Sequence, residues 1–279
     1  MAKVGTVPYT VVSRKHSITW CAVCLTLSSV NPSMPDNQAL QAEPTRNKLL
    51  AALPQGEREL IEEHATRVTL AHREILYQPD VPMKYVYFVV DGIASLLSVM
   101  SDGASVETAT IGREGMVGMP VFHGVFATRE QVMVQVPGVA YRLDADAFRA
   151  LLPRLPQLDT LLHRFAVMMF TLAAQNSGCN RKHSIEARCA RWMLMVADRL
   201  DTNTLELTHD FVAQMLGVRR ASVTEALGDL EKRGLIATAR GRITITDGQG
   251  LRGVACECYA VIRGVSHRLL ETADATPSA

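Results

Sequence analysis

The sequence has little cysteine, no long apolar run and almost no net charge, and each shortage excludes a class of protein. Six cysteines in 279 residues are too few for a secreted disulfide scaffold, so we expect free thiols in a reducing cytoplasm. The apolar runs are too short for a membrane-spanning helix, so no membrane partner is expected. With 29 basic and 28 acidic residues, the chain as a whole lacks the charge signature of nucleic-acid binding.

Catalytic and metal-binding motifs are also missing. The chain has no phosphate-binding loop, nucleophile elbow or zinc-protease motif, and no spacing of Ser, His and Asp defines a triad. A metal ion or iron–sulfur cluster normally needs four ligands, which the local pairs of cysteine do not supply. The sequence therefore predicts no enzyme, no metal site and no cofactor. The cysteines are dispersed along the chain, at Cys21, Cys24, Cys179, Cys189, Cys256 and Cys258.

The most informative stretch is residues 208–247. Its apolar residues recur at spacings of three and four in two short segments, and Gly217 between them permits the left-handed backbone of a tight turn. The second helix is expected to stop at Gly234, and residues 235–246 alternate as a two-stranded wing with a basic turn. Two amphipathic helices around a glycine also occur in ordinary cores. The turn, the wing and an outward face that begins with arginine favour a winged helix-turn-helix that binds DNA.

A β-rich domain precedes this module, between residues 68 and 143. Short apolar strands alternate there with turn residues, including Asp91-Gly92 and Pro137-Gly138, which we interpret as hairpin turns. Asp144 has the side chain of a helix cap at the start of the following helix. Several short strands with regular turns predict a small barrel or jelly roll.

A helical segment with an apolar seam follows the β-rich domain. The seam residues recur at spacings of four and three, so a second copy of the helix could pair with it in a parallel coiled coil and a symmetric dimer. The alternative is that the seam packs on its own β-domain. The predicted seam consists of Leu158, Leu162, Phe165, Met169 and Leu172.

The first 33 residues allow two interpretations. A basic flank before the apolar run 18–27 has the outline of a short signal peptide. Export would separate a helix-turn-helix from its DNA, so we favour a disordered extension. The predicted organisation is a disordered extension (1–44), a β-roll sensor domain (45–152), a dimerisation helix (153–178), a winged helix-turn-helix domain (179–250) and a partly helical tail (251–279).

This order of elements resembles the Crp/Fnr family of bacterial transcription regulators over about residues 45–250. The motifs that carry the resemblance are Tyr-Phe-Val-Val-Asp-Gly at 87–92, Gly118, and Leu-Gly-Val-Arg-Arg-Ala-Ser-Val-Thr-Glu-Ala-Leu at 216–227. The resemblance implies an α+β fold with an N-terminal cyclic-nucleotide-binding-like β-roll (jelly roll), a long dimerisation helix and a C-terminal winged helix-turn-helix. It also implies a cytoplasmic homodimer that binds double-stranded DNA at an inverted-repeat operator. RNA polymerase and an unidentified small-molecule effector are further partners that it allows.

The ligand motifs of the resembling proteins are poorly kept. Family members that bind cyclic AMP hold the ribose with a Gly-Glu pair, whereas Gly118 is followed here by Met119, which has no carboxylate to accept a hydrogen bond. Thr128 and Arg129 stand near the place of the phosphate-binding run, where Arg129 could pair with an anion. These four residues are the candidate ligand site, and cyclic AMP is not the expected ligand. Two alternatives remain: a cyclic-nucleotide-responsive regulator with a divergent pocket, and a protein-interaction module that uses the same fold.

The DNA contacts follow from the same resemblance. The family reads bases with Arg-Glu-x-x-x-Arg at the start of the recognition helix, and this chain keeps only the first arginine, Arg220, for guanine. Ala221 and Glu225 replace the other two residues, so the operator should differ from the best-known family site. The predicted DNA-binding residues are Arg219, Arg220, Ala221, Ser222, Thr224 and Glu225 on the helix, and Arg240 and Arg242 on the wing.

Overall fold

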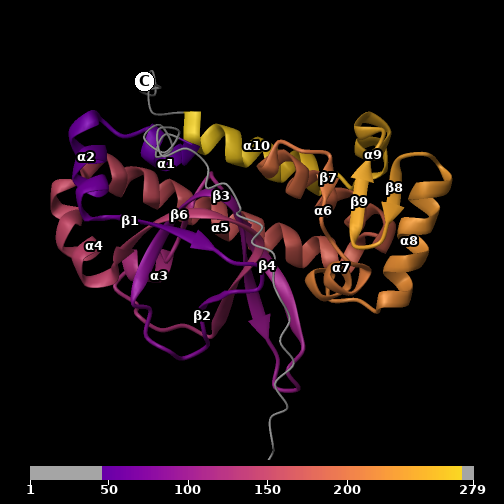
Figure 1. Cartoon of the computed structure of the whole chain (residues 1–279), viewed down its shortest axis with the longest axis horizontal. Coiled ribbons are helices and arrows are strands. Elements are labelled where there is room, and N and C mark those ends of the chain that lie inside the picture. The colour runs from indigo at the N-terminus through magenta and orange to yellow at the C-terminus, as the bar shows by residue number, and fades with distance from the viewer. Residues whose placement is uncertain (1–45, 272–279) are drawn as a thin grey trace, which may run out of the picture. The chain divides into compact units, whose positions relative to one another are not determined.

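The computed structural model describes residues 46–271 of the chain (Figure 1). The predicted N-terminal extension, residues 1–44, lies outside them together with Cys21 and Cys24. The helices are α1 Lys48–Ala51, α2 Gln55–His64, α3 Met119–Phe122, α4 Ala145–Leu151, α5 Pro156–Lys182, α6 Ile185–Leu200, α7 His209–Leu216, α8 Arg220–Lys232, α9 Gly248–Val254 and α10 Cys258–Glu271. The strands are β1 Thr66–Leu70, β2 Ile75–Tyr77, β3 Tyr85–Val99, β4 Ser105–Ile111, β5 Met116–Val117, β6 Glu130–Asp144, β7 Thr204–Leu205, β8 Ile236–Ala239 and β9 Arg242–Ile245.

The N-terminal domain is an antiparallel β-roll. Its main strands lie in the order β1-β6-β3-β4, with β2 added on β6 and β5 on β3. The next helix begins as predicted at Asp144, whose carboxylate accepts hydrogen bonds from the amides of Asp146 and Ala147 at 3.0 and 3.1 Å. None of the described helices is long and apolar enough to cross a bilayer.

The two longest strands correct the prediction of hairpin turns at Asp91-Gly92 and Pro137-Gly138. Strands β3 and β6 continue through these positions without reversing, and they pair with each other on both sides of them, with shifts of register. A Cβ on Gly138 would lie 2.1 Å from the carbonyl oxygen of Asp91, and one on Gly92 would lie 2.6 Å from that of Val136. The glycines therefore allow two bent strands to approach closely instead of reversing the chain.

The long helix α5 packs on the β-roll and corrects the predicted dimer seam. Four of the five predicted seam residues, and their neighbours on the same face, are buried in the core of their own chain because α5 covers the roll. Phe165 is 1% exposed and lies so close to Gly115 that a Cβ there would meet its ring at 2.2 Å. The buried seam residues are Leu158, Leu162, Phe165 and Leu172, and Met169 is partly buried beside them.

The C-terminal half surrounds a second core that includes residues of the β-roll. Ile93, Leu97 and Ala109 from the roll belong to the same buried cluster as Trp192 of α6 and the apolar faces of α7 and α8. Helix α10 returns from the winged helix to pack on α5 and α6 (Figure 1). Of the predicted tail, residues 251–279, the described part holds the end of α9 and the whole of α10. The β-roll and the helix-turn-helix share one apolar core.

Candidate nucleic-acid interface

The helix-turn-helix forms where the apolar spacing predicted it. The Thr208 hydroxyl caps α7 by accepting a hydrogen bond from the amide of Phe211 at 3.2 Å, and Gly217 ends the helix in the left-handed conformation with φ 62°. Helix α8 begins three residues later and ends at Lys232, before Gly234. Its inward stripe of Val223, Ala226, Leu227 and Leu230 is buried, as the spacing predicts.

The opposite face of α8 is open to solvent over its first turns. All of the predicted DNA-binding residues on it are exposed except Ser222, which is half-buried. Arg220 approaches Asp210 of α7, with a nitrogen and an oxygen 3.4 Å apart, and both side chains are about two-thirds exposed, at 67% and 64%. An exposed ion pair of this kind contributes less than about 1 kcal/mol, so Arg220 remains available to a base edge.

Sequence analysis missed that the start of α7 takes part in this surface. His209 Nδ1 lies 3.0 Å from the hydroxyl oxygen of Thr224, across the gap between the two helices. Together with Asp210, His209 borders the recognition helix on one side. The signal in the sequence was the Thr208 cap, which places the next two residues on the first turn of α7.

The wing presents two arginines, of which one forms an ion pair. Arg242 at the start of β9 pairs with Glu206, with 2.8 Å between Nε and the carboxylate. Arg240 lies in the exposed turn between β8 and β9 and has no ion-pair partner among residues 46–271. Glu231 of α8 accepts hydrogen bonds from the amide and the hydroxyl of Thr238 at 2.6 and 2.9 Å. These bonds hold the wing against the recognition helix, so helix and wing form one surface with several arginines.

Comparison with known proteins identifies both halves. A model described as the cyclic nucleotide-binding domain matches residues 67–154, and one described as the Crp-like helix-turn-helix domain matches residues 187–254. The chain belongs to the Crp/Fnr family. Its members among the curated relatives are transcription regulators rather than enzymes, and the predicted family, α+β fold and non-enzymatic class are confirmed.

Individual Crp/Fnr relatives are distant in sequence. A global nitrogen regulator of Nostoc sp. is 24% identical over 188 residues, covering 63% of this chain and 83% of the relative. A CRP-like cAMP-activated global transcriptional regulator of Mycobacterium tuberculosis is 25% identical over 179 residues, covering 61% and 79%. The structure of FixK2 from Bradyrhizobium japonicum superposes with a TM-score of 0.60 at 19% identity, covering 69% of this chain and 98% of that one.

The candidate ligand residues of this Crp/Fnr β-roll are already engaged within the protein. Gly118 has φ 117°, and a Cβ there would lie 2.7 Å from the Tyr77 hydroxyl. Met119 opens α3 and packs against the core of the roll. Arg129 is 83% exposed and pairs with Asp80 at 3.0 Å, and the carbonyl of Thr128 accepts a hydrogen bond from the Asp80 amide.

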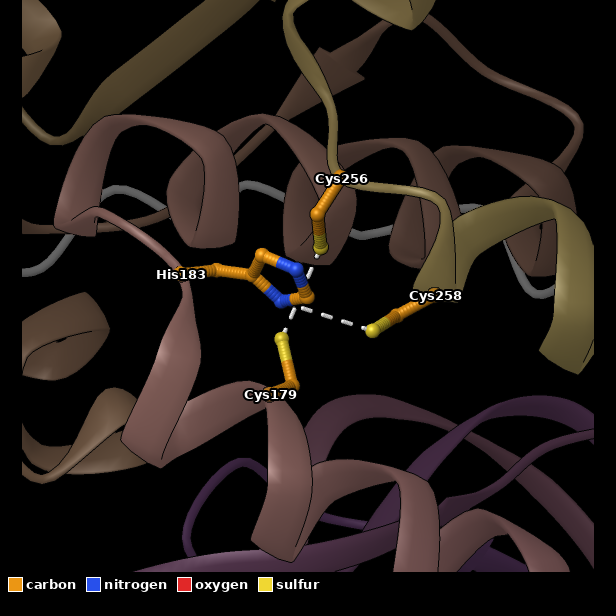
Figure 2. A group of neighbouring side chains, drawn as sticks. All are labelled: Cys179, His183, Cys256 and Cys258. Carbon is orange, nitrogen blue, oxygen red and sulfur yellow. Dashed lines mark hydrogen bonds between the residues drawn. The ribbon is translucent and has the colours of Figure 1, made fainter.

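The structure corrects the expectation that the cysteines are dispersed. Cys179 near the end of α5, Cys256 just before α10 and Cys258 at its first residue are buried together, with His183 beside them (Figure 2). One ligand atom from each of the four residues lies within 4.8 Å of the others. Folding brings together two local pairs that are 77 residues apart in sequence, which spacing alone did not reveal.

Proposed function

We propose that this Crp/Fnr regulator works in the cytoplasm as a homodimer that binds an inverted-repeat operator through α8 and the wing. The exposed outward face of α8, which begins with Arg219 and Arg220 and lies beside the basic wing, is the observation that carries the proposal. A helix presented in this way fits the DNA major groove, where Arg220 can donate two hydrogen bonds to guanine. We expect Arg240, which is exposed in the turn of the wing, to contact phosphate.

Dimerisation is proposed through the face of α5 that the β-roll leaves uncovered. Along this helix, exposed positions recur at spacings of three and four, which is the pattern of a coiled-coil seam. Two of them are large apolar side chains, Val167 at 58% and Phe170 at 76% exposure. A second copy of α5 would bury them in a twofold interface. The proposed stripe consists of Thr160, His163, Val167, Phe170, Ala174 and Ser177.

The effector of the β-roll is proposed to be a small molecule other than cyclic AMP. Met119 supplies no acceptor for a ribose hydroxyl, and Arg129 is 83% exposed and pairs with Asp80. The second candidate is a cyclic-nucleotide-responsive regulator with a divergent pocket, which the name of the Mycobacterium tuberculosis relative favours. RNA polymerase is a further proposed partner of the regulator.

Duplex binding as a function of salt tests the proposal against a protein-interaction role for the same fold. The affinity of the wild-type protein for a labelled duplex should fall steeply as salt rises, because each phosphate contact releases counterions. Arg240→Ala should weaken binding to all duplexes alike and reduce the slope of log affinity against log salt by about 1. Arg58→Ala, on α2 away from the interface, is the matched control and should leave the slope unchanged. Salt-insensitive or absent duplex binding by the folded wild-type protein would exclude the DNA-binding role.

A further inference from the structure

Three cysteines and one histidine converge at the junction between α5 and α6. Cys179 lies on the last turn of α5 and His183 caps that helix four residues later, so both side chains project from the same side. Cys256 lies between α9 and α10, Cys258 is the first residue of α10, and both approach from the opposite side (Figure 2). The cysteines form a small buried cluster of their own, separate from the two large apolar cores.

The distances within the group fit one tetrahedral metal ion. The sulfurs of Cys179 and Cys256 are 3.5 Å apart, and His183 Nδ1 lies 3.5 Å from the sulfur of Cys258. Ligands at zinc bond lengths span tetrahedral edges of about 3.8 Å between two sulfurs and about 3.6 Å between sulfur and nitrogen. An iron–sulfur cluster binds its cysteines to different iron atoms and therefore needs wider separations. A disulfide requires a sulfur–sulfur distance near 2 Å, which this pair does not have.

The surroundings of the group are those of a metal site. His183 Nε2 lies 3.1 Å from the Glu257 carboxylate, so the nitrogen that faces the sulfurs is left free to bind a metal. A carboxylate on the outer nitrogen is the usual arrangement for a metal-binding histidine. Gln175 Nε2 also donates to the sulfur of Cys258 at 3.0 Å, a contact that favours a thiolate.

Two buried arginines near the group carry positive charge opposite in sign to that of an occupied zinc–thiolate site. Arg188 and Arg191 are only 5% and 3% exposed, and neither lies within 4.0 Å of a carboxylate among residues 46–271, although Arg191 also interacts electrostatically with Glu107. Both interact electrostatically with Cys179. A buried unpaired cation is costly, and a divalent ion bound by three thiolates and a neutral histidine has a net charge of −1. An occupied site would therefore offset the two buried positive charges in part.

We propose that Cys179, His183, Cys256 and Cys258 bind one Zn²⁺ through their three sulfurs and His183 Nδ1. Four protein ligands leave no open position, so the site is structural rather than catalytic. It joins the end of α5 to the start of α10 at the junction with the helix-turn-helix domain. The ion fixes the C-terminal helix and the connection between the sensor half and the DNA-binding half.

Metal analysis of the full-length protein, purified without added metal or a polyhistidine tag, tests the site directly. The wild-type protein should contain one zinc per chain, and Cys256→Ala and Cys258→Ala should contain none. Cys189→Ala, which changes a buried cysteine outside the group, should keep its zinc. The double variant Cys21→Ala/Cys24→Ala should also keep it, which excludes a contribution from the N-terminal pair.

Reconstitution keeps the test decisive if a cysteine variant fails to fold. Metal-stripped wild-type protein loaded with Co²⁺ should show the intense visible absorption of a tetrahedral, thiolate-rich site, and Zn²⁺ should displace it. Glu257→Gln should weaken zinc binding about 10- to 100-fold in competition with a chelator. Folded wild-type protein without zinc that cannot bind Co²⁺ would overturn the proposal, as would stoichiometric iron with inorganic sulfide or a Cys179–Cys256 disulfide. None of these readouts depends on DNA binding.

Discussion

Glu107 is a buried carboxyl group where the β-roll meets the DNA-binding half. Its oxygens accept a hydrogen bond from Trp192 Nε1 at 2.9 Å and lie 2.8 Å from the Ser95 hydroxyl. Burial raises the pKa of Glu107 to about 7, against lowering contributions from the hydrogen bonds of Ser95 and Trp192 and from the charges of Arg191 and Arg199. The carboxyl is therefore partly protonated near neutral pH.

Hydrogen-bond counting allows two protonation states of this group. Ser95 Oγ lies 2.8 Å from Gln135 Oε1 as well as from Glu107, and one hydroxyl proton serves only one acceptor. A protonated Glu107 donates to Ser95, which then donates to Gln135. Rotation of the Gln135 amide resolves the count differently, with Gln135 as the donor and Glu107 ionised.

The pH dependence of stability distinguishes these arrangements. The folded-state pKa of Glu107 lies above the ordinary value of 4.5. Its contribution to the free energy of unfolding is therefore fully present below pH 4.5 and is lost as pH rises to about 7. The loss is roughly 3 kcal/mol at most. Glu107→Gln keeps both hydrogen bonds and should flatten that part of the unfolding free energy measured by denaturant titration. Glu63→Gln, at an exposed carboxylate, is the control. A wild-type slope in Glu107→Gln would show that Glu107 is ionised throughout.

Met119 and Arg129 lead to a prediction about the effector. Calorimetry should detect weak or no binding of cyclic AMP, because Met119 has no carboxylate to accept a hydrogen bond from the ribose. Asp80→Ala, which removes the exposed partner of Arg129, is the matched comparison and should leave the affinity for cyclic AMP weak, because the missing carboxylate is at Met119. Micromolar affinity of the wild-type protein for cyclic AMP would contradict the proposed effector class and support the divergent-pocket alternative.

At the scale of whole elements, α5 has two apolar faces with different partners. One face packs on the β-roll, and the other exposes Val167 and Phe170. A substitution at Phe165 therefore reports on the core, because a charge there would be buried in the chain's own roll. Only the second face can report on dimerisation.

Phe170→Glu should convert the proposed dimer to a folded monomer, since it places two like charges opposite each other across the twofold axis. Sedimentation velocity at micromolar concentration measures the change, and circular dichroism checks the fold. Val81→Glu introduces the same charge at an exposed apolar residue outside α5 and should remain dimeric. A monomeric wild-type protein, or a dimeric Phe170→Glu variant, would show that the stripe is not the interface.

The elements also show what the sequence could predict. The helix-turn-helix was predictable because the Thr208 cap, Gly217 and the buried stripe of α8 are local signals. The partner of α5 was not, since residues 158–172 and 160–177 both show heptad spacing and only packing decides which set the roll covers. Asp91-Gly92 and Pro137-Gly138 are typical of turns, yet they permit a close approach between distant strands. The four residues of the proposed zinc site come together only through the path of α10.

At the scale of the whole molecule, the β-roll and the DNA-binding half are mechanically connected. Trp192 bonds to Glu107, Gln214 of α7 donates to Ser105 of β4 at 3.0 Å, and Val106 packs on Gly217 at the turn. A change in the β3–β4 hairpin would therefore be transmitted directly to the helix-turn-helix.

Selection of bound duplexes from a random pool by the purified wild-type protein tests the central claim most directly. The enriched sequences should form an inverted repeat with half-sites about 34 Å apart, one helical turn, and a guanine in each half-site should depend on Arg220. Arg220→Ala should cost about 1 to 3 kcal/mol per contact on the selected duplex and relax the preference at that base. The absence of any enriched repeat, or equal losses on selected and scrambled duplexes for Arg220→Ala, would contradict this account of the recognition helix.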